Sequence, residues 1–151
     1  MANKSLVNKS LTNKNLNDVM LLQPQDLVAE KWVLGAILLD GDCFKKAYDI
    51  LRYDDFYKTS HMLIFKAMTA LYEEQASIDI VTVADKLREK EKLDAVGGVA
   101  YLSQLVIEIS TSANITYHAE IVKEKSQKRQ ILKLCREVID EIYSDTELED
   151  I

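Results

Sequence analysis

The sequence predicts a helical fold that ends in one long, partly projecting helix, and three observations support this. Apolar residues recur at positions i, i+3, i+4 and i+7 in several stretches, which is the spacing of one buried helix face. The last of these stretches runs from residue 113 to about residue 144 and has a polar middle, so a small body cannot cover all of it. The 151 residues suffice for about one domain with a single hydrophobic core.

Residues 1–23 are predicted to form a flexible tail in front of the folded body. They contain the repeated motifs NKSL, NKSL and NKNL, which supply too few apolar side chains to offset the entropy lost on ordering. Pro24 marks the end of this tail. We therefore expect ordered structure to begin at this proline.

The first predicted helix covers residues 27–40. Asp26 precedes it and is a suitable N-cap, because its carboxylate can accept a hydrogen bond from a free amide of the first turn. Gly35 costs about 1 kcal/mol relative to alanine in a helix interior, which indicates the close approach of a neighbouring helix. The apolar face is predicted to contain Val28, Ala29, Trp32, Val33, Ala36, Ile37 and Leu38.

Two more helices are predicted after a turn at residues 40–42. The first is short, covers residues 43–51, and has on its inward face Phe44, Ala47, Tyr48 and Leu51. The second covers residues 61–74 and has on its inward face Ile64, Ala67, Met68, Leu71 and Tyr72. Between them, Asp54 and Asp55 are expected to cap a turn, because adjacent carboxylates on a turn rarely face one substrate.

The pattern of residues 77–93 supports two interpretations. The β-branched residues from Ile80 to Val83 favour a strand. Asp79 as a cap, with apolar residues at helical spacing behind it, favours a helix. A glycine loop at residues 97–98 then leads into a short helix, and Ser112 is predicted to cap the long final helix.

Composition and charge exclude several classes of protein. The two cysteines, Cys43 and Cys135, are too far apart for a C-x-x-C motif, which indicates a reducing, cytoplasmic environment rather than a disulfide scaffold. No apolar run approaches the roughly 20 residues that span a bilayer, so no membrane partner is expected. The net charge of −6 disfavours direct nucleic-acid binding, because an acidic surface repels phosphates.

Charges are concentrated towards the C-terminus. Residues 137–151 hold seven acids and no base. A basic cluster precedes them and consists of Lys123, Lys125, Lys128, Arg129, Lys133 and Arg136. It is predicted to wrap around the final helix as a solvated surface, with a phosphate-binding patch as the alternative.

No catalytic, cofactor or metal site is predicted in this segment. His61 and His118 lie among apolar neighbours and lack a second ligand four residues on, so both are interpreted as structural or surface histidines. Cys135 lies four residues before Ile139 and is interpreted as a small apolar core side chain. The four glycines form no G-x-x-x-x-G-K-[ST] motif, so no ATP site is expected.

Six motifs follow one another between residues 24 and 136: VLGAILLD, DDFYKTSHMLIFKAM, LYEE, IDIVTVADKL, VGGVAYLSQL and SANITYHAEIVKEK. As an ordered set they resemble the N-terminal domain of the DnaB family of replicative DNA helicases. The resemblance implies an all-α fold with a compact head over residues 24–111 and a projecting helical hairpin that uses residues 112–151. It also implies a helix at Ile80–Val83. One departure is Lys58–Thr59, where the family commonly has an acid followed by proline; Thr59 is expected to cap the next helix.

The resemblance also implies a function and partners. Such domains form the collar of a hexameric ring, pair with a second copy through their hairpins, and dock primase. ATP-dependent 5′–3′ unwinding, with ATP and magnesium, belongs to a RecA-like domain that this segment lacks, so the segment is expected to belong to a longer protein and to meet DNA only through the complete ring. The alternative is a free-standing helical adaptor or regulator that binds a replicative helicase. A weaker third interpretation is a small nucleic-acid-binding protein.

The residues predicted to mediate self-association are Leu132, Cys135, Val138, Ile139 and Ile142.

Overall fold

The computed structural model describes residues 23–146, and every regular element within them is helical. The predicted tail over residues 1–23 falls, apart from Gln23, outside the described residues, as do the acids after Thr146. The elements in chain order are α3 (Leu27–Leu39), η1 (Gly41–Cys43), α4 (Phe44–Tyr48), η2 (Tyr53–Asp55), α5 (Thr59–Glu73), α6 (Ile80–Glu89), α7 (Leu93–Val96), α8 (Gly98–Ile107) and α9 (Ile115–Thr146).

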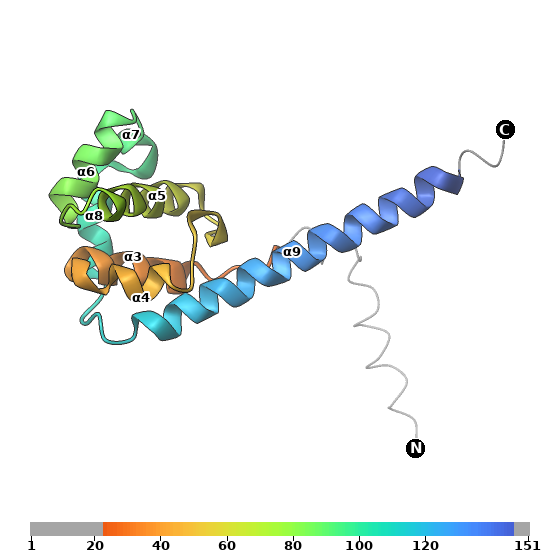
Figure 1. The fold of residues 1–151 in the computed structure, drawn as a ribbon, viewed down its shortest axis with the longest axis horizontal. Coiled ribbons are helices and arrows are strands. Elements are labelled where there is room, and N and C mark those ends of the chain that lie inside the picture. The colour runs from red at the N-terminus through yellow and green to blue at the C-terminus, as the bar shows by residue number, and fades with distance from the viewer. Residues whose placement is uncertain (1–22, 147–151) are drawn as a thin grey trace, which may run out of the picture.

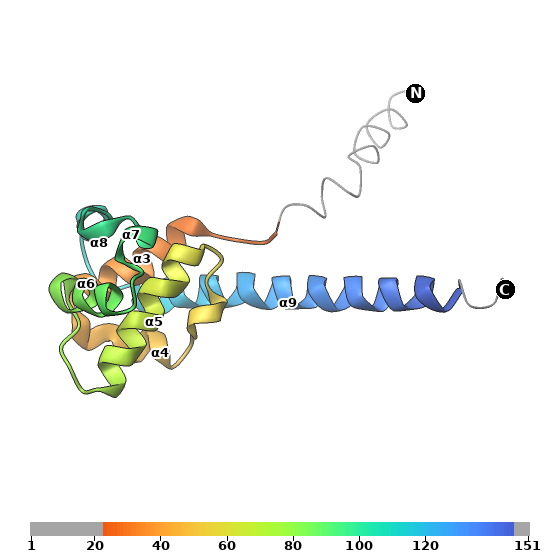
Figure 2. The ribbon, with the colours of Figure 1, turned by 90° about the horizontal axis from the view of Figure 1, so that it is seen from above.

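Helices α3 to α8 form a compact head, and α9 leaves it as a straight rod (Figures 1 and 2). Helix α3 is central, because it packs against α8, α5 and the first part of α9. The predicted all-α fold with a long C-terminal helix is confirmed. Within residues 23–146 the projection consists of α9 alone, and the second helix of the expected hairpin is not among the described elements.

The sequence of α3 explains its central position. Asp26 caps the helix as predicted, since its Oδ1 accepts a hydrogen bond of 2.9 Å from the Ala29 amide. Gly35 lies directly against α8, where a Cβ atom built on it would be 2.4 Å from the carbonyl oxygen of Leu105. The prediction for Val28 is wrong, because the side chain is 65% exposed. The buried residues of α3 instead begin at Ala29 and Glu30 and include every residue from Val33 to Leu38.

Residues 80–89 form a helix rather than a strand. The Asp79 carboxylate accepts from the Thr82 amide at 2.9 Å, and the Thr82 hydroxyl oxygen accepts from the Asp79 amide at 3.0 Å. This reciprocal capping box fixes the helix start at the point where β-branched residues favoured a strand. Val83 and Leu87 are buried one turn apart, whereas Val81 faces solvent.

Two predicted caps are wrong. Helix α9 begins at Ile115, and the Ser112 hydroxyl lies 3.5 Å from Asp40 instead of capping α9. Residues 113–114 form a turn, which moves the helix start two residues along the chain. Thr59 is the first residue of α5 and not its cap, since the amides before it bind a side chain from α3.

Aromatic side chains fill the space between α4 and α5. The Phe44 ring lies 5.4 Å from that of Phe65 and 5.0 Å from that of Tyr72, measured between ring centroids. Phe56 meets Phe65 at 4.9 Å. Phe44, Ala47 and Leu51 are fully buried, as their spacing predicted, whereas Tyr72 lies at the edge of this cluster and is partly exposed.

The contact at Gly35 predicts that Gly35→Ala destabilises the head by about 1–3 kcal/mol, because the added methyl group forces α3 and α8 apart. Urea unfolding followed by circular dichroism measures this. Val28→Ala on the same helix is the control and should change the unfolding free energy by less than about 0.5 kcal/mol, since Val28 is exposed. Equal effects of the two substitutions would contradict the assignment of the α3–α8 contact.

Candidate functional site

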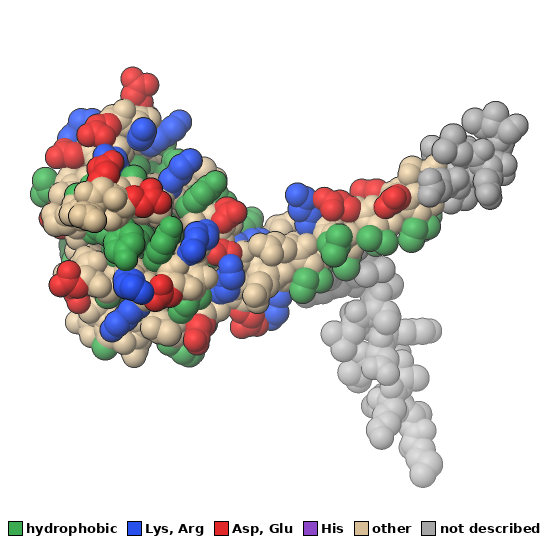
Figure 3. Space-filling view, in the orientation of Figure 1, with side chains coloured by type: hydrophobic (Ala, Val, Ile, Leu, Met, Phe, Trp, Pro, Cys, Tyr) green, Lys and Arg blue, Asp and Glu red, His purple; other side chains and the backbone are tan. Residues whose placement is uncertain are grey.

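The projecting half of α9 carries a continuous apolar stripe. The predicted self-association residues all lie on it: Leu132 is half-buried, and Cys135, Val138, Ile139 and Ile142 are exposed. Figure 3 shows apolar side chains along one side of the free helix and acidic ones along the other. The stripe also includes residues that were not assigned to self-association, namely Ile131, Leu134 and Tyr143.

The helical period explains why the head does not cover this stripe. Residues 115–126 bury one face against the head through Ile115, Ala119, Val122 and Ser126. Cys135 follows Ser126 by nine residues, which is about two and a half turns, so the two lie on opposite sides of α9. The apolar stripe is therefore not a continuation of the head core. A straight α9 presents it to a surface other than its own head.

The direction of α9 is fixed by Asp55 at the end of η2. Its buried carboxylate accepts from the Arg52 amide at 2.8 Å, from Lys123 Nζ at 3.1 Å and from the Ser126 hydroxyl at 2.7 Å. Arg129 adds hydrogen bonds to the carbonyl oxygens of Asp55 at 2.6 Å and Pro24 at 2.7 Å. Asp55 thus caps a turn, as predicted, and also clamps α9. The helix becomes free just after this clamp.

The basic cluster on α9 is divided among separate partners. Lys123 and Arg129 bind the head through Asp55. Lys128 pairs with Glu124 one turn earlier, and Lys133 lies 3.8 Å from Glu137. These four residues are thus paired with separate acids or carbonyl groups, as expected of a solvated helix surface.

A buried carboxylate that the sequence reasoning missed joins α3, α5 and α8. Glu30 Oε1 accepts from the Tyr57 amide at 2.5 Å, and Oε2 accepts from the Lys58 amide at 3.4 Å. His61 Nδ1 lies 2.6 Å from the same carboxylate and donates to it, while His61 Nε2 lies 2.7 Å from the Tyr101 hydroxyl. The His61 ring is fully buried, so no substrate reaches it, and its role is structural as predicted. The available signal was that Glu30 is the one acid of α3 and follows Ala29 of the predicted apolar face.

Comparison with known proteins identifies the family. A family model described as the DnaB-like helicase N-terminal domain matches residues 22–124. The chain belongs to this family. The DnaB-like domain is 39% identical over 131 residues to the replicative DNA helicase DnaC of Bacillus subtilis (strain 168), which covers 86% of this chain and 29% of that protein. It therefore spans less than a third of this relative's length.

Two solved structures share the DnaB-like fold. The crystal structure of the N-terminal domain of DnaB helicase from Mycobacterium tuberculosis has a TM-score of 0.79 and 37% identity, and the match covers 81% of this chain and 85% of that one. A DnaB-like replicative helicase, described with its interactions with primase, has a TM-score of 0.70 and 28% identity; the match covers 79% of this chain and 28% of that one. Across residues 23–146 of this DnaB-like domain, every helix is too short or too polar to cross a membrane.

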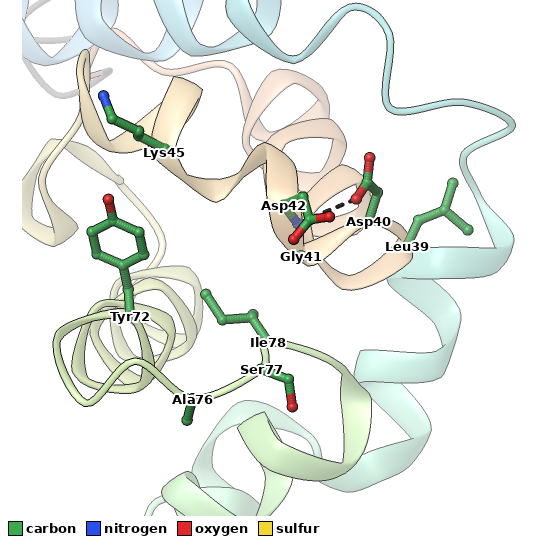
Figure 4. Close-up of a pocket in the computed structure, with 9 residues that line it drawn as sticks. All are labelled: Leu39, Asp40, Gly41, Asp42, Lys45, Tyr72, Ala76, Ser77 and Ile78. Atoms are coloured by element: carbon green, nitrogen blue, oxygen red, sulfur yellow. Dashed lines mark hydrogen bonds between the residues drawn. The ribbon is translucent and has the colours of Figure 1, made fainter.

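A hollow of about 550 Å³ on the head of the DnaB-like domain lies between the α3–α4 turn and the segment after α5 (Figure 4). Asp40 lines it, but its Oδ1 accepts from the Asp42 amide at 3.2 Å and so caps η1. Lys45 and Tyr72 line another side, and none of the nine lining residues is a histidine or a cysteine. Lys45 is paired with Asp49 at 3.1 Å, and we assign no catalytic role to this hollow.

The remaining histidine and the two cysteines of the DnaB-like domain lie in different environments. His118 stacks on Trp32 with ring centroids 5.0 Å apart, and burial lowers its pKa. No group of three or more His, Cys, Asp and Glu residues within the described part of the chain could hold a metal ion. Cys43 is buried, but the prediction that Cys135 is a core residue is wrong, because the apolar stripe on which it lies points away from the head.

The Glu30 network predicts that Glu30→Ala lowers the unfolding free energy by about 3–5 kcal/mol, because it leaves two backbone amides and a buried histidine without their acceptor. Glu30→Gln should cost less, since one acceptor oxygen remains. Glu120→Ala, on an exposed position of α9, is the control and should leave the urea midpoint nearly unchanged. A near-neutral Glu30→Ala would show that the network does not stabilise the head.

The two cysteines are predicted to differ in reactivity. Burial raises the pKa of the Cys43 thiol to about 11, so at pH 8 it stays protonated, and the attacking thiolate is scarce. Iodoacetamide added to a dilute solution at pH 8 should therefore modify Cys135 alone, as read by peptide mass spectrometry. Cys43 should react only after urea is added. Modification of Cys43 at the same rate in the folded protein would contradict its placement in the core.

Proposed function

We propose that this chain is the collar domain of a hexameric replicative DNA helicase and that it assembles by pairing α9 with α9 of a second copy. The observation that carries the proposal is the apolar stripe on the free half of α9, which lies opposite the face buried against the head. Membership of the DnaB-like helicase N-terminal domain family supports the assignment to a helicase collar.

The free energy of hydration favours covering the stripe. Each Å² of apolar area removed from water contributes about 25 cal/mol, so a helix with exposed Ile, Leu, Val and Tyr side chains gains from a partner. A two-fold pair is the commonest closed arrangement of identical chains. The matching apolar seam of a second α9 is the simplest cover, through Leu132, Cys135, Val138, Ile139 and Ile142.

The distribution of charge favours an antiparallel pair. In a parallel pair the acids from Glu137 onward would lie beside their own copies and repel each other. An antiparallel pair instead places the acids of the free half of α9, Glu137, Asp140 and Glu141, beside basic residues of the partner's α9. Opposite charges along the two rims would then orient the pair, while the apolar seam supplies most of its stability.

The larger assembly is inferred from the relatives. One DnaB-like helicase with this fold is described with its interactions with primase, and we extend primase docking to the collar proposed here. ATP and magnesium would act in a C-terminal motor domain, and DNA would be bound by the complete ring. The proposal places this work in the cytoplasm, in agreement with the reduced cysteines expected from the sequence.

The seam predicts that Ile139→Asp converts the protein to a monomer, because it places a charge in the middle of an apolar contact. Analytical ultracentrifugation across a range of concentrations measures the state, and circular dichroism should remain helical because Ile139 makes no contact with the head core. Gln130→Asp introduces the same charge on the opposite side of α9 and is the matched control. It should leave the association unchanged.

The proposed α9–α9 contact would be contradicted if the wild-type protein stays monomeric at every concentration, or if the Ile139→Asp variant still pairs. Iodoacetamide labelling gives a second measurement, because Cys135 lies on the seam. Its rate of modification should fall as the wild-type concentration rises and should stay constant in the Ile139→Asp variant.

A further inference from the structure

A second surface of the head has the shape and charge of a docking site. A groove of about 360 Å³ runs between α5 and α6. Its floor is apolar and is hollowed by two alanines of α5; the floor residues are Leu63, Ala67, Ala70 and Leu87. Its rim carries the side chains of Lys66, Lys86, Lys90 and Lys92, and no acidic residue lines it.

Three of the rim lysines, Lys66, Lys90 and Lys92, have no acidic partner within the described residues. The positive charge of Lys86 is already balanced, because the carboxylates of Glu74 and Glu89 lie 2.9 Å and 3.2 Å from its ammonium group. Lys66 lies over the Tyr53 ring, 5.0 Å from its centroid. Lys90 and Lys92 are exposed. The groove therefore favours a ligand that has apolar side chains for the floor and carboxylates for the rim.

The chain itself contains a segment of this chemistry. Residues 145–151 read DTELEDI and contain four acids, no base, and two apolar residues, Leu148 and Ile151. No other segment of the chain combines so high a density of acids with apolar residues and the absence of any base. Charge complementarity thus singles out this segment as the occupant of the groove.

The segment cannot reach the groove of its own head. The last buried residue of α9 is Ser126, and the helix continues to Thr146, about 30 Å further at 1.5 Å per residue. The five residues that follow span at most about 18 Å when fully extended. If residues 145–151 bind a groove of this kind, that groove must therefore belong to another copy of the chain.

We infer that the groove between α5 and α6 binds residues 145–151 of a second copy of the chain. This rests on the proposed collar function and deepens it. A two-fold pair through α9 joins only two copies, and an assembly larger than a dimer requires a second type of contact. The groove is free for that contact, because α9 packs on α3, α4 and η2, on the side of the head away from α6 (Figure 1).

The test measures binding of a fluorescein-labelled peptide of residues 143–151 to the full chain by fluorescence anisotropy. The wild type should bind it saturably. Lys90→Glu with Lys92→Glu should weaken binding about tenfold or more, because two attractions become repulsions. Lys125→Glu with Lys128→Glu makes the same charge change on α9 and is the matched control, with an expected change of less than about twofold. A peptide with Leu148→Ser and Ile151→Ser should bind more weakly to the wild type.

Three outcomes would overturn the inference: no binding by the wild type, equal binding by the Lys90→Glu/Lys92→Glu variant, or an equal loss in the α9 control. The last would place the segment on the basic half of α9. The Ile139→Asp variant separates this test from that of the proposed function. It should still bind the peptide, because its groove is intact, so failure of the seam and failure of the groove give different results.

Discussion

The carboxylate of Glu30 is the interaction on which the arrangement of the head depends. It lies fully buried on the central helix, and its oxygens accept hydrogen bonds from two backbone amides at the start of α5 and from His61. His61 in turn reaches Tyr101 on α8. A buried charge is stable only when such partners surround it, so α3, α5 and α8 can adopt only an arrangement that keeps them in place. The helix start that lacks a side-chain cap of its own is capped here from another helix.

Asp55 plays the corresponding part at the base of α9. It binds Lys123 and Ser126 on one side of the helix, and Arg129 closes the contact. Beyond this clamp the apolar side chains of α9 shift to the opposite face. The same helix thus belongs to two contacts: its first part completes the core of the head, and its second part presents an apolar stripe for which the head has no complementary surface. Both requirements together explain why the helix is long, straight and polar in the middle.

The two surfaces left open on the domain differ in character. The stripe on α9 is apolar and lies along one face of the helix, which suits a two-fold pair with a second α9. The groove between α5 and α6 is basic, and the tip of α9 is acidic, which suits a contact between different parts of two copies. An assembly that uses both contacts can extend beyond a dimer, as a ring-forming helicase collar requires.

The sequence by itself determined the features that depend on neighbours along the chain. The Asp26 cap, the helical periods and the close approach at Gly35 could be predicted because capping and periodicity act within a few residues. The helical conformation of residues 80–89 depends on a local capping box that outweighs the β propensity of Ile80 to Val83. The family resemblance favoured this helix. Only the tertiary structure decided that Glu30 is buried, that Val28 is exposed and that Cys135 points away from the head. The physical reason is that periodicity locates an apolar face without specifying which surface, if any, covers it.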